Sequence, residues 1–259
     1  MSEPILLRHA EAGIATLTLN RPAARNALSI ALMSEMEAAL AALAADRSVK
    51  VVVLAANGPA FCAGHDLKEM RSLEGREAVA AVFAQCARVM TAIVRLPQPV
   101  IARVHAMATA AGCQLVASCD LAYAADTAQF ATPGVNIGLF CSTPMVALSR
   151  VVGRKQAMEM LLSGHPVDAA TAQAWGLINH AVAPDRLDTE VADMATLIAG
   201  KSPYTVKTGK EAFYRQAEMG LDEAYAYAAE VMTSNLLARD AQEGIDAFLT
   251  KRPPRWEGC

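Results

Sequence analysis

Phe61-Cys-Ala-Gly-His-Asp-Leu67 is the most informative stretch of this chain, and Ala110-Ala-Gly-Cys-Gln114 downstream has the same character. Each is a turn of small residues that leads into a predicted helix. The first amides of a helix have no acceptor inside it, so both turns are expected to expose backbone N–H groups. Two such turns converging on one point would bind an oxyanion, the negative oxygen that develops when a carbonyl is attacked or enolised.

The bulk properties narrow the classes of function. A chain of 259 residues can form one large domain, or a domain with an appendage, around a well-buried core. A net charge of −3 and a pI near 6.0 leave no basic face for nucleic acid. No apolar run approaches the ~20 residues of a membrane helix, and no signal or transit peptide is evident. We therefore expect a cytoplasmic protein with no membrane or nucleic-acid partner.

The six cysteines form no Cys-x-x-Cys pair, which favours reduced, buried thiols.

The apolar pattern predicts an α/β fold, because strands and helices alternate along the first part of the chain. Strands are predicted at 13–19, 49–54, 100–104 and 121–124, and helices at 29–45, from near 66, at 77–94 and at 111–118. After residue 142 the pattern is mostly helical, apart from 177–182. Lys201-Ser-Pro203 is the expected boundary between a core, residues 1–200, and a C-terminal helical region, residues 201–259. The helices of that region are predicted at 205–217, 221–235 and 240–252.

Six motifs, in this order, resemble those of the crotonase (enoyl-CoA hydratase/isomerase) superfamily. They are Asn20-Arg-Pro-Ala-Ala-Arg-Asn-Ala-Leu28, Phe61 to Leu67, Pro99-Val-Ile-Ala102, Ala111-Gly-Cys-Gln-Leu115, Cys119-Asp120 and Ala247-Phe-Leu-Thr-Lys-Arg252. The resemblance implies a spiral of repeated β-β-α units and a C-terminal helical trimerisation region, assembled as a trimer or as a hexamer of two trimers. It also implies an acyl-CoA thioester as ligand, with coenzyme A as part of the substrate and no other cofactor.

By motif position, the resemblance assigns the two amides that would polarise the thioester carbonyl to His65 and Ala111. Alanines stand at 110 and 111 where the family usually has glycines, so a positive φ at Ala111 would strain the loop. Further residues are predicted to line or brace the substrate site. They are Ala63, Asp66 and Leu67 in the first turn, Gly134, Cys141, and Lys251 near the nucleotide end of CoA.

The sequence departs from the family at both catalytic glutamates, which are replaced by Gln114 and Gly134. Neither residue exchanges a proton near neutral pH, and one positioned acid–base group contributes on the order of 10²–10⁴ in rate. Ordinary enoyl-CoA hydration is therefore not expected, and glutamates at both positions are predicted to raise it. Residues 138–144 resemble the branch of enoyl-CoA hydratase domain-containing paralogues. His65 resembles the methylmalonyl-CoA decarboxylase branch, which also works without the two glutamates.

Three functions stay open at this stage. The first is a lyase or isomerase of acyl-CoA, among which decarboxylation of a malonyl-type ester needs the oxyanion site but no strong protein base. The others are a non-catalytic acyl-CoA binder and a purely structural assembly protein. His65 would orient a carboxylate, donate a proton or only shape its loop, and Gln114 would hydrogen-bond the ligand. No metal is expected, because the other histidines lack metal-ligand spacing.

Overall fold

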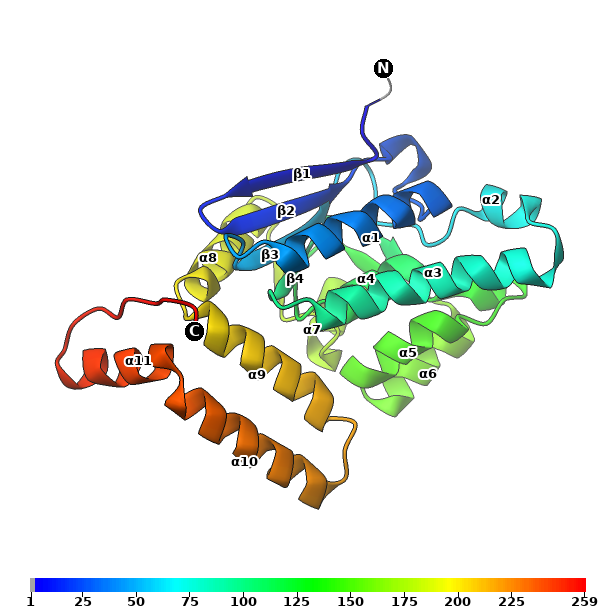
Figure 1. The fold of residues 1–259 in the computed structure, drawn as a ribbon. Coiled ribbons are helices and arrows are strands. Elements are labelled where there is room, and N and C mark those ends of the chain that lie inside the picture. Colours follow the sequence, from blue (N-terminus) through cyan, green and yellow to red (C-terminus); the bar gives the residue numbers. More distant parts are fainter. Residues whose placement is uncertain (1–2) are drawn as a thin grey trace.

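The computed structural model describes residues 3–259, which fold around a six-stranded sheet (Figure 1). The strands are β1 (Leu6–Glu11), β2 (Ile14–Leu19), β3 (Val51–Ala56), β4 (Val100–Val104), β5 (Ala108–Thr109), β6 (Leu121–Ala125), β7 (Gln129–Ala131), β8 (Val167–Asp168) and β9 (His180–Val182). The helices are α1 (Ile30–Ala45), α2 (Leu67–Ser72), α3 (Gly75–Arg95), α4 (Ala111–Ser118), α5 (Ser142–Val151), α6 (Arg154–Ser163), α7 (Ala169–Trp175), α8 (Leu187–Ala199), α9 (Pro203–Gln216), α10 (Leu221–Leu237) and α11 (Arg239–Leu249). Two 3₁₀ turns, η1 (Pro22–Ala24) and η2 (Pro133–Ile137), complete the set.

The main sheet has the strand order β1-β2-β3-β4-β6-β9, and only the β1–β2 pair is antiparallel. A small second sheet, β5-β7-β8, lies beyond it. Parallel neighbours end at the same edge of a sheet, and this edge is where ligands bind in open α/β folds. The segments that follow β3, β4 and β6 therefore gather at one edge, and they contain both turns predicted to bind the oxyanion.

The sheet is covered on both faces. Val52 and Leu54 of β3 belong to the core that α1, α3 and α4 complete, whereas Val51 and Val53 pack with α8 on the other face. Every residue of β3 is buried. The prediction of a doubly covered strand from this apolar run is thus confirmed, although the strand lies two residues further along than expected.

The α1 helix shows how local sequence fixes an element. Ser29 is the N-cap, and its hydroxyl accepts a hydrogen bond from Leu32 N at 3.1 Å. The buried residues of α1 follow helical spacing: Leu32, Met33, Met36, Leu40 and Leu43. The predictions for α1, α3, α4 and the three C-terminal helices are confirmed to within a few residues at their ends.

The sequence pattern missed β1, β5, β7 and β8. Strand β1 lies at the edge of the sheet with mostly exposed residues, so no apolar alternation marks it. The other three have two or three residues each. At that length, pairing with a neighbouring strand decides the conformation rather than local pattern.

The α3 helix corrects the expectation that no apolar stretch is long enough for a membrane helix. By length and composition alone it could cross a membrane, and it is the one such helix among residues 3–259. Its buried side chains, which include Val82, Cys86 and Val89, pack in the core against α1 and α4. In this structure α3 therefore has the packing of a core helix.

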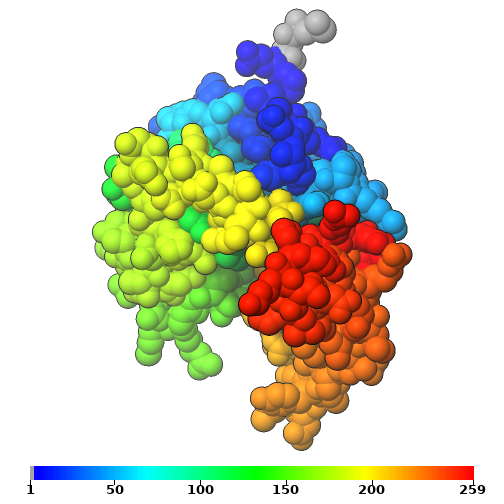
Figure 2. Space-filling model, turned by 90° about the vertical axis from the view of Figure 1, so that its left-hand side faces the viewer, coloured from blue at the N-terminus to red at the C-terminus, as the bar shows by residue number. Residues whose placement is uncertain are grey.

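The C-terminal helices α9, α10 and α11 form a lobe beside the core, coloured orange to red in Figure 2. Their outward residues are unusually apolar, since Phe213, Leu237 and Phe248 are all well exposed, Phe248 by 83%. One buried ion pair ties the lobe down: Lys210 Nζ of α9 lies 2.7 Å from an Asp120 carboxylate oxygen. The expected boundary at 201–203 lies where α8 has ended and α9 begins, and as a division between core and C-terminal region it stays a prediction.

Candidate functional site

The turn at residues 61–66 is held between two neighbouring segments. On one side Leu28 N donates to Gly64 O at 2.7 Å, and Asp66 N donates to Leu28 O at 3.2 Å. On the other side Thr109 N donates to Cys62 O at 2.9 Å. In a parallel bridge of this kind the N–H of the middle residue, His65, points away from Leu28. The turn is thus fixed on both sides while the His65 N–H stays free of Leu28.

The second turn packs directly against the first. A Cβ atom at Gly64 would lie 2.8 Å from Ala110 Cβ and 3.4 Å from Ala111 N. Ala111 is the first residue of α4, where no intrahelical acceptor exists. Among residues 3–259 neither His65 N nor Ala111 N donates to a protein acceptor. The two predicted turns therefore meet, with two unpaired amides beside their contact.

The strain expected in this loop lies one residue earlier than anticipated. Ala110, the N-cap of α4, has φ 51° and ψ −118°, and its N–H donates to Ala131 O at 2.9 Å. A non-glycine residue in this region costs of order 1–3 kcal/mol. The Ala111 amide itself is in a helix and is unstrained.

The imidazole of His65 lies inside the site without a partner. Both ring nitrogens are buried, and neither forms a hydrogen bond within the described part of the chain. The ring meets Phe83 of α3 edge-on, with centroids 5.5 Å apart. Burial lowers the pKa of His65 and outweighs the opposing effect of the nearby Leu28 backbone, which lies outside hydrogen-bond geometry, so the ring is neutral near pH 7 and offers one donor and one acceptor. A buried unsatisfied polar group costs about 1–3 kcal/mol, which a ligand with a matching polar group would recover.

Gln114 lies one helical turn beyond Ala111 and is 5% exposed. Its Oε1 atom is 4.0 Å from Cys86 Sγ of α3, a weak thiol contact. The side chain is thus near the paired turns and has hydrogen-bonding capacity left over.

Gly134 is covered by the chain that follows it. A Cβ atom there would lie 2.3 Å from Leu139 O and 2.9 Å from Cys141 Sγ, and Leu139 N donates to Gly134 O at 2.9 Å. A glutamate at 134 fits only if this loop moves, so replacing Gln114 and Gly134 together is not a fair test of the pocket. Burial raises the pKa of the Cys141 thiol, which argues against a nucleophilic role.

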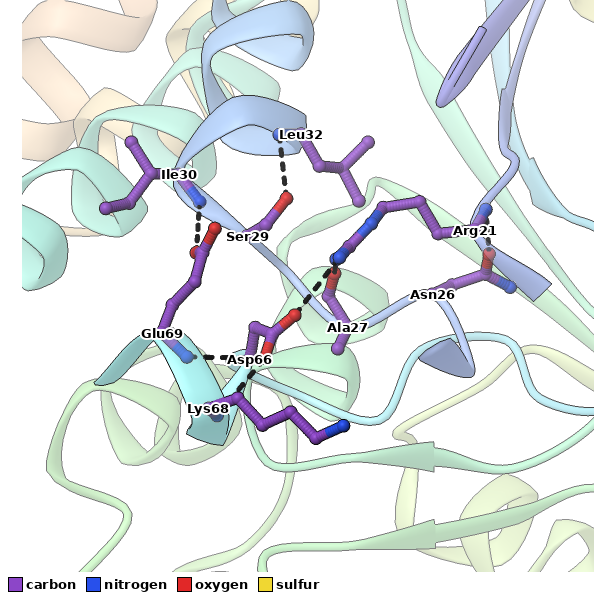
Figure 3. Close-up of polar contacts among 9 residues, drawn as sticks. All are labelled: Arg21, Asn26, Ala27, Ser29, Ile30, Leu32, Asp66, Lys68 and Glu69. Atoms are coloured by element: carbon purple, nitrogen blue, oxygen red, sulfur yellow. Dashed lines mark hydrogen bonds and ion pairs between the residues drawn. The ribbon is translucent and has the colours of Figure 1, made fainter. Parts of the chain in front are cut away.

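Asp66 caps α2, as its position suggested. One carboxylate oxygen accepts from Lys68 N at 3.2 Å, and the other pairs with Arg21 at 3.1 Å (Figure 3). Burial acts to raise the pKa of Asp66, but the Arg21 and backbone hydrogen bonds outweigh it and hold the pKa below its usual value. Ala63 and Leu67 are exposed on either side of this turn.

Lys251 is not brought to the other predicted residues within one chain. It follows α11, is exposed and has φ 55°. Figure 1 shows α11 and α2 at opposite sides of the molecule. The predicted contact of Lys251 with CoA therefore stays a prediction.

Several residues at the site carried no predicted role. Arg21 and Asn26 form hydrogen bonds that support the His65 turn, and the Phe83 ring packs edge-on against the imidazole. Thr132 is fully buried, and its hydroxyl has no partner within residues 3–259. The usable signal for Arg21 and Asn26 was their place in the Asn20 to Leu28 motif, directly after a strand. No local pattern marks Phe83 or Thr132.

The described residues also contain no group of three or more His, Cys, Asp or Glu side chains arranged to hold a metal ion. All six cysteines are free, and five of them are buried.

The chain belongs to the enoyl-CoA hydratase/isomerase family, whose model matches residues 9–259. It is 47% identical over 244 residues to the mitochondrial enoyl-CoA hydratase domain-containing protein 3 of Rattus norvegicus, covering 94% of this chain and 81% of that protein. The crystal structure of an enoyl-CoA hydratase from Mycobacterium smegmatis matches with a TM-score of 0.96 and 56% identity, over 98% of this chain and 99% of that one. The human enoyl coenzyme A hydratase domain-containing protein 3 matches with a TM-score of 0.95 and 46% identity, over 98% and 100% of the two chains. The predicted family and fold class are confirmed.

The comparisons also correct the predicted location. The expectation of a cytoplasmic protein is wrong by this measure, because five vertebrate relatives, 45–48% identical, are named as mitochondrial proteins. Composition, charge and reduced cysteines are compatible with both compartments, so they could not separate them.

Proposed function

We propose that this chain binds an acyl-CoA thioester and stabilises its enolate between the N–H groups of His65 and Ala111. The observation that carries the proposal is the contact of the two turns at Gly64 and Ala110, with both amides unpaired beside it. Hydrogen-bond donors that are already in place gain most when negative charge develops on the thioester oxygen. Loss of one such donor typically costs ~2.7–4 kcal/mol of transition-state stabilisation.

The residues around the paired amides favour decarboxylation of a malonyl-type acyl-CoA over hydration. Gln114 and the covered Gly134 supply no carboxylate to activate water or remove an α-proton. In a decarboxylation the bond between the α-carbon and the carboxylate breaks, its electron pair forms the enolate, and CO₂ leaves. The enolate then takes a proton at the α-carbon. No protein base is needed for the first step, and the neutral His65 ring can donate a hydrogen bond to the substrate carboxylate.

A second candidate, a non-catalytic acyl-CoA binder, is favoured by one observation. Leu139 O and Cys141 Sγ fill the space beside Gly134. A site that has lost the room for a catalytic side chain, and not only the side chain, is consistent with binding without turnover.

Self-association belongs to the same proposal. The exposed apolar residues of α9, α10 and α11 are those expected of a surface that another copy covers in a trimer or hexamer. Sedimentation velocity on the purified protein measures the assembly directly, and a monomer at micromolar concentration would refute this part.

The function is tested in two steps. Thermal unfolding is followed with acetyl-CoA, malonyl-CoA, methylmalonyl-CoA and free CoA. Saturation at 100 times Kd adds about 2.7 kcal/mol of stability, which raises Tm by on the order of 5 °C for a chain of this size. Release of CO₂ from the malonyl-type esters is then measured. Binding with CO₂ release supports the decarboxylase, and binding without turnover supports the second candidate. No shift with any ester refutes the acyl-CoA site.

A further inference from the structure

We propose that Arg21 is a positioning residue, which holds the His65 amide in line with the Ala111 amide without touching the substrate. The proposal rests on the proposed function, because it assigns a task to Arg21 only if the two amides act together. Arg21 lies just after β2 and belongs to neither turn, and its side chain extends to Ala27 and Asp66 (Figure 3).

The guanidinium of Arg21 joins the two segments that carry the His65 turn. Nη1 donates to Ala27 O, and Nη2 donates to an Asp66 carboxylate oxygen at 3.1 Å. Leu28, the residue after Ala27, holds Gly64 and Asp66 by backbone hydrogen bonds. Arg21 therefore links residues 25–28, which support the turn, to Asp66, the residue directly after His65.

Residues 25–28, the support segment, need this link because part of their backbone is strained. Arg25 and Asn26 both have positive φ, 51° and 54°, a left-handed conformation that is unfavourable for arginine and better tolerated by asparagine. The fully buried Asn26 stabilises the strained backbone. Its Nδ2 donates to Asn57 O at 2.7 Å and to Ala60 O at 2.8 Å, while its Oδ1 accepts from Arg21 N at 2.8 Å. Arg25 O in turn accepts from Ala63 N at 3.0 Å.

A second link runs between the starts of the two helices. Glu69 of α2 accepts a hydrogen bond from Ile30 N of α1 at 2.8 Å, and Asp66 caps α2 (Figure 3). The carboxylates lie at helix N-termini, which favour negative charge. Breaking the Arg21–Asp66 pair would leave Asp66 as the cap of α2 but would free it from Ala27. We therefore expect the turn to shift without unfolding α2.

Only arginine suits this position. Its planar fork reaches two acceptors at once, whereas a lysine ammonium is a point charge on a flexible stem. The side chains of Arg21 and Asp66 are 22% and 16% exposed, so solvent screens the pair only in part. Arg103 of β4 provides a control arginine that also pairs with an aspartate, Asp188 of α8, on the face of the sheet that α8 covers. The Arg103 side chain is 25% exposed, close to the 22% of Arg21, although Asp188 is 75% exposed.

The test compares Arg21→Lys and Arg21→Gln with Arg103→Gln, each in the 259-residue chain. The first readout is the isotope-edited infrared band of ¹³C-carbonyl acetyl-CoA bound to each variant, because this band reports polarisation of the thioester carbonyl. We expect wild type and Arg103→Gln to shift the band equally. In both Arg21 variants the shift should be largely lost, while affinity for free CoA changes less than twofold. If the proposed decarboxylation occurs, kcat should fall roughly 10²-fold, the cost of misplacing a catalytic geometry by about 1 Å, with little change in KM.

The outcomes separate this proposal from the proposed function. A wild-type band shift in Arg21→Lys or Arg21→Gln overturns the role of Arg21 while leaving the acyl-CoA site intact. If wild type binds no acyl-CoA, the proposed function fails, and amide hydrogen exchange over residues 61–67 decides whether Arg21 still orders the turn. Faster exchange in the Arg21 variants than in Arg103→Gln supports that ordering, and equal exchange overturns it.

Discussion

Gly64→Ala is the substitution that most directly tests whether the two turns must touch. Gly64 has φ 89°, and an added Cβ would meet Ala110 Cβ at 2.8 Å and Thr109 O at 3.2 Å. Contact at 2.8 Å must open to at least 3.4 Å before it becomes an ordinary van der Waals contact. The backbone term is about 1–2 kcal/mol, and overpacking adds about 1–3 kcal/mol. We expect a loss of about 2–5 kcal/mol in the free energy of unfolding and, because one amide leaves its place, a 10²–10³-fold loss in turnover.

Urea denaturation and acyl-CoA turnover or binding measure the two effects. Gly75→Ala is the matched control, since Gly75 has φ 80° and nothing within 4 Å of the added atom. It should show the backbone term alone. Adding Ala110→Gly to Gly64→Ala removes the closest contact and should restore part of both stability and function, as a positive coupling in a double-mutant cycle. Equal losses for Gly64→Ala and Gly75→Ala, with no coupling to Ala110, would refute the reasoning.

Three further predictions address the rest of the structure. Gly134→Ala should cost about 1–3 kcal/mol in urea denaturation, because the new Cβ meets Leu139 O at 2.3 Å; unchanged stability would show that the loop yields. Burial lowers the pKa of His65 below its ordinary 6.5, so the unfolded chain protonates first as the pH falls. Wild type should therefore lose stability relative to His65→Gln between pH 8 and pH 5.5, and a constant difference in denaturation midpoints would contradict this. Lys210→Met leaves the Asp120 carboxylate without its ammonium partner, so it should lower the free energy of unfolding by about 3 kcal/mol and speed amide exchange in α9. A loss under about 1 kcal/mol would contradict a stabilising role for the pair.

The sequence was sufficient for the fold and for the meeting of the two turns. Both turns are short runs of small residues next to helix patterns, and both follow apolar runs that the pattern predicts to be strands, of which β3 is buried along its whole length. Because parallel strands end at one edge, the order of elements already implied that the segments at 61–66 and 107–111 would lie close together. The apolar stripe placed the start of a helix at Ser29, and the carboxylate of Asp66 indicated a second helix start; both residues are N-caps in the structure.

The features that the sequence could not supply depend on contacts between distant segments. Nothing around Gly134 indicates that Leu139 O would fold back over it. Nothing around Arg21 indicates that its guanidinium would bridge Ala27 and Asp66, since Arg21 and Asp66 are 45 positions apart in the sequence. Lys251 shows the opposite case: its motif suggested a role at the site, but it follows α11, which lies on the opposite side of the molecule from α2, so its role stays a prediction.

The distribution of backbone strain gives a separate reason to regard the His65 turn as functional. The non-glycine residues with positive φ among residues 3–259 are Ala12, Arg25, Asn26, Ala110 and Lys251, and three of them surround this turn. Arg25 and Asn26 support it from one side, and Ala110 packs against Gly64 from the other. Strain of this kind persists only where surrounding interactions fix the conformation, and it gathers at ligand sites. The concentration of these positions around two unpaired amides therefore supports the proposed role of those amides.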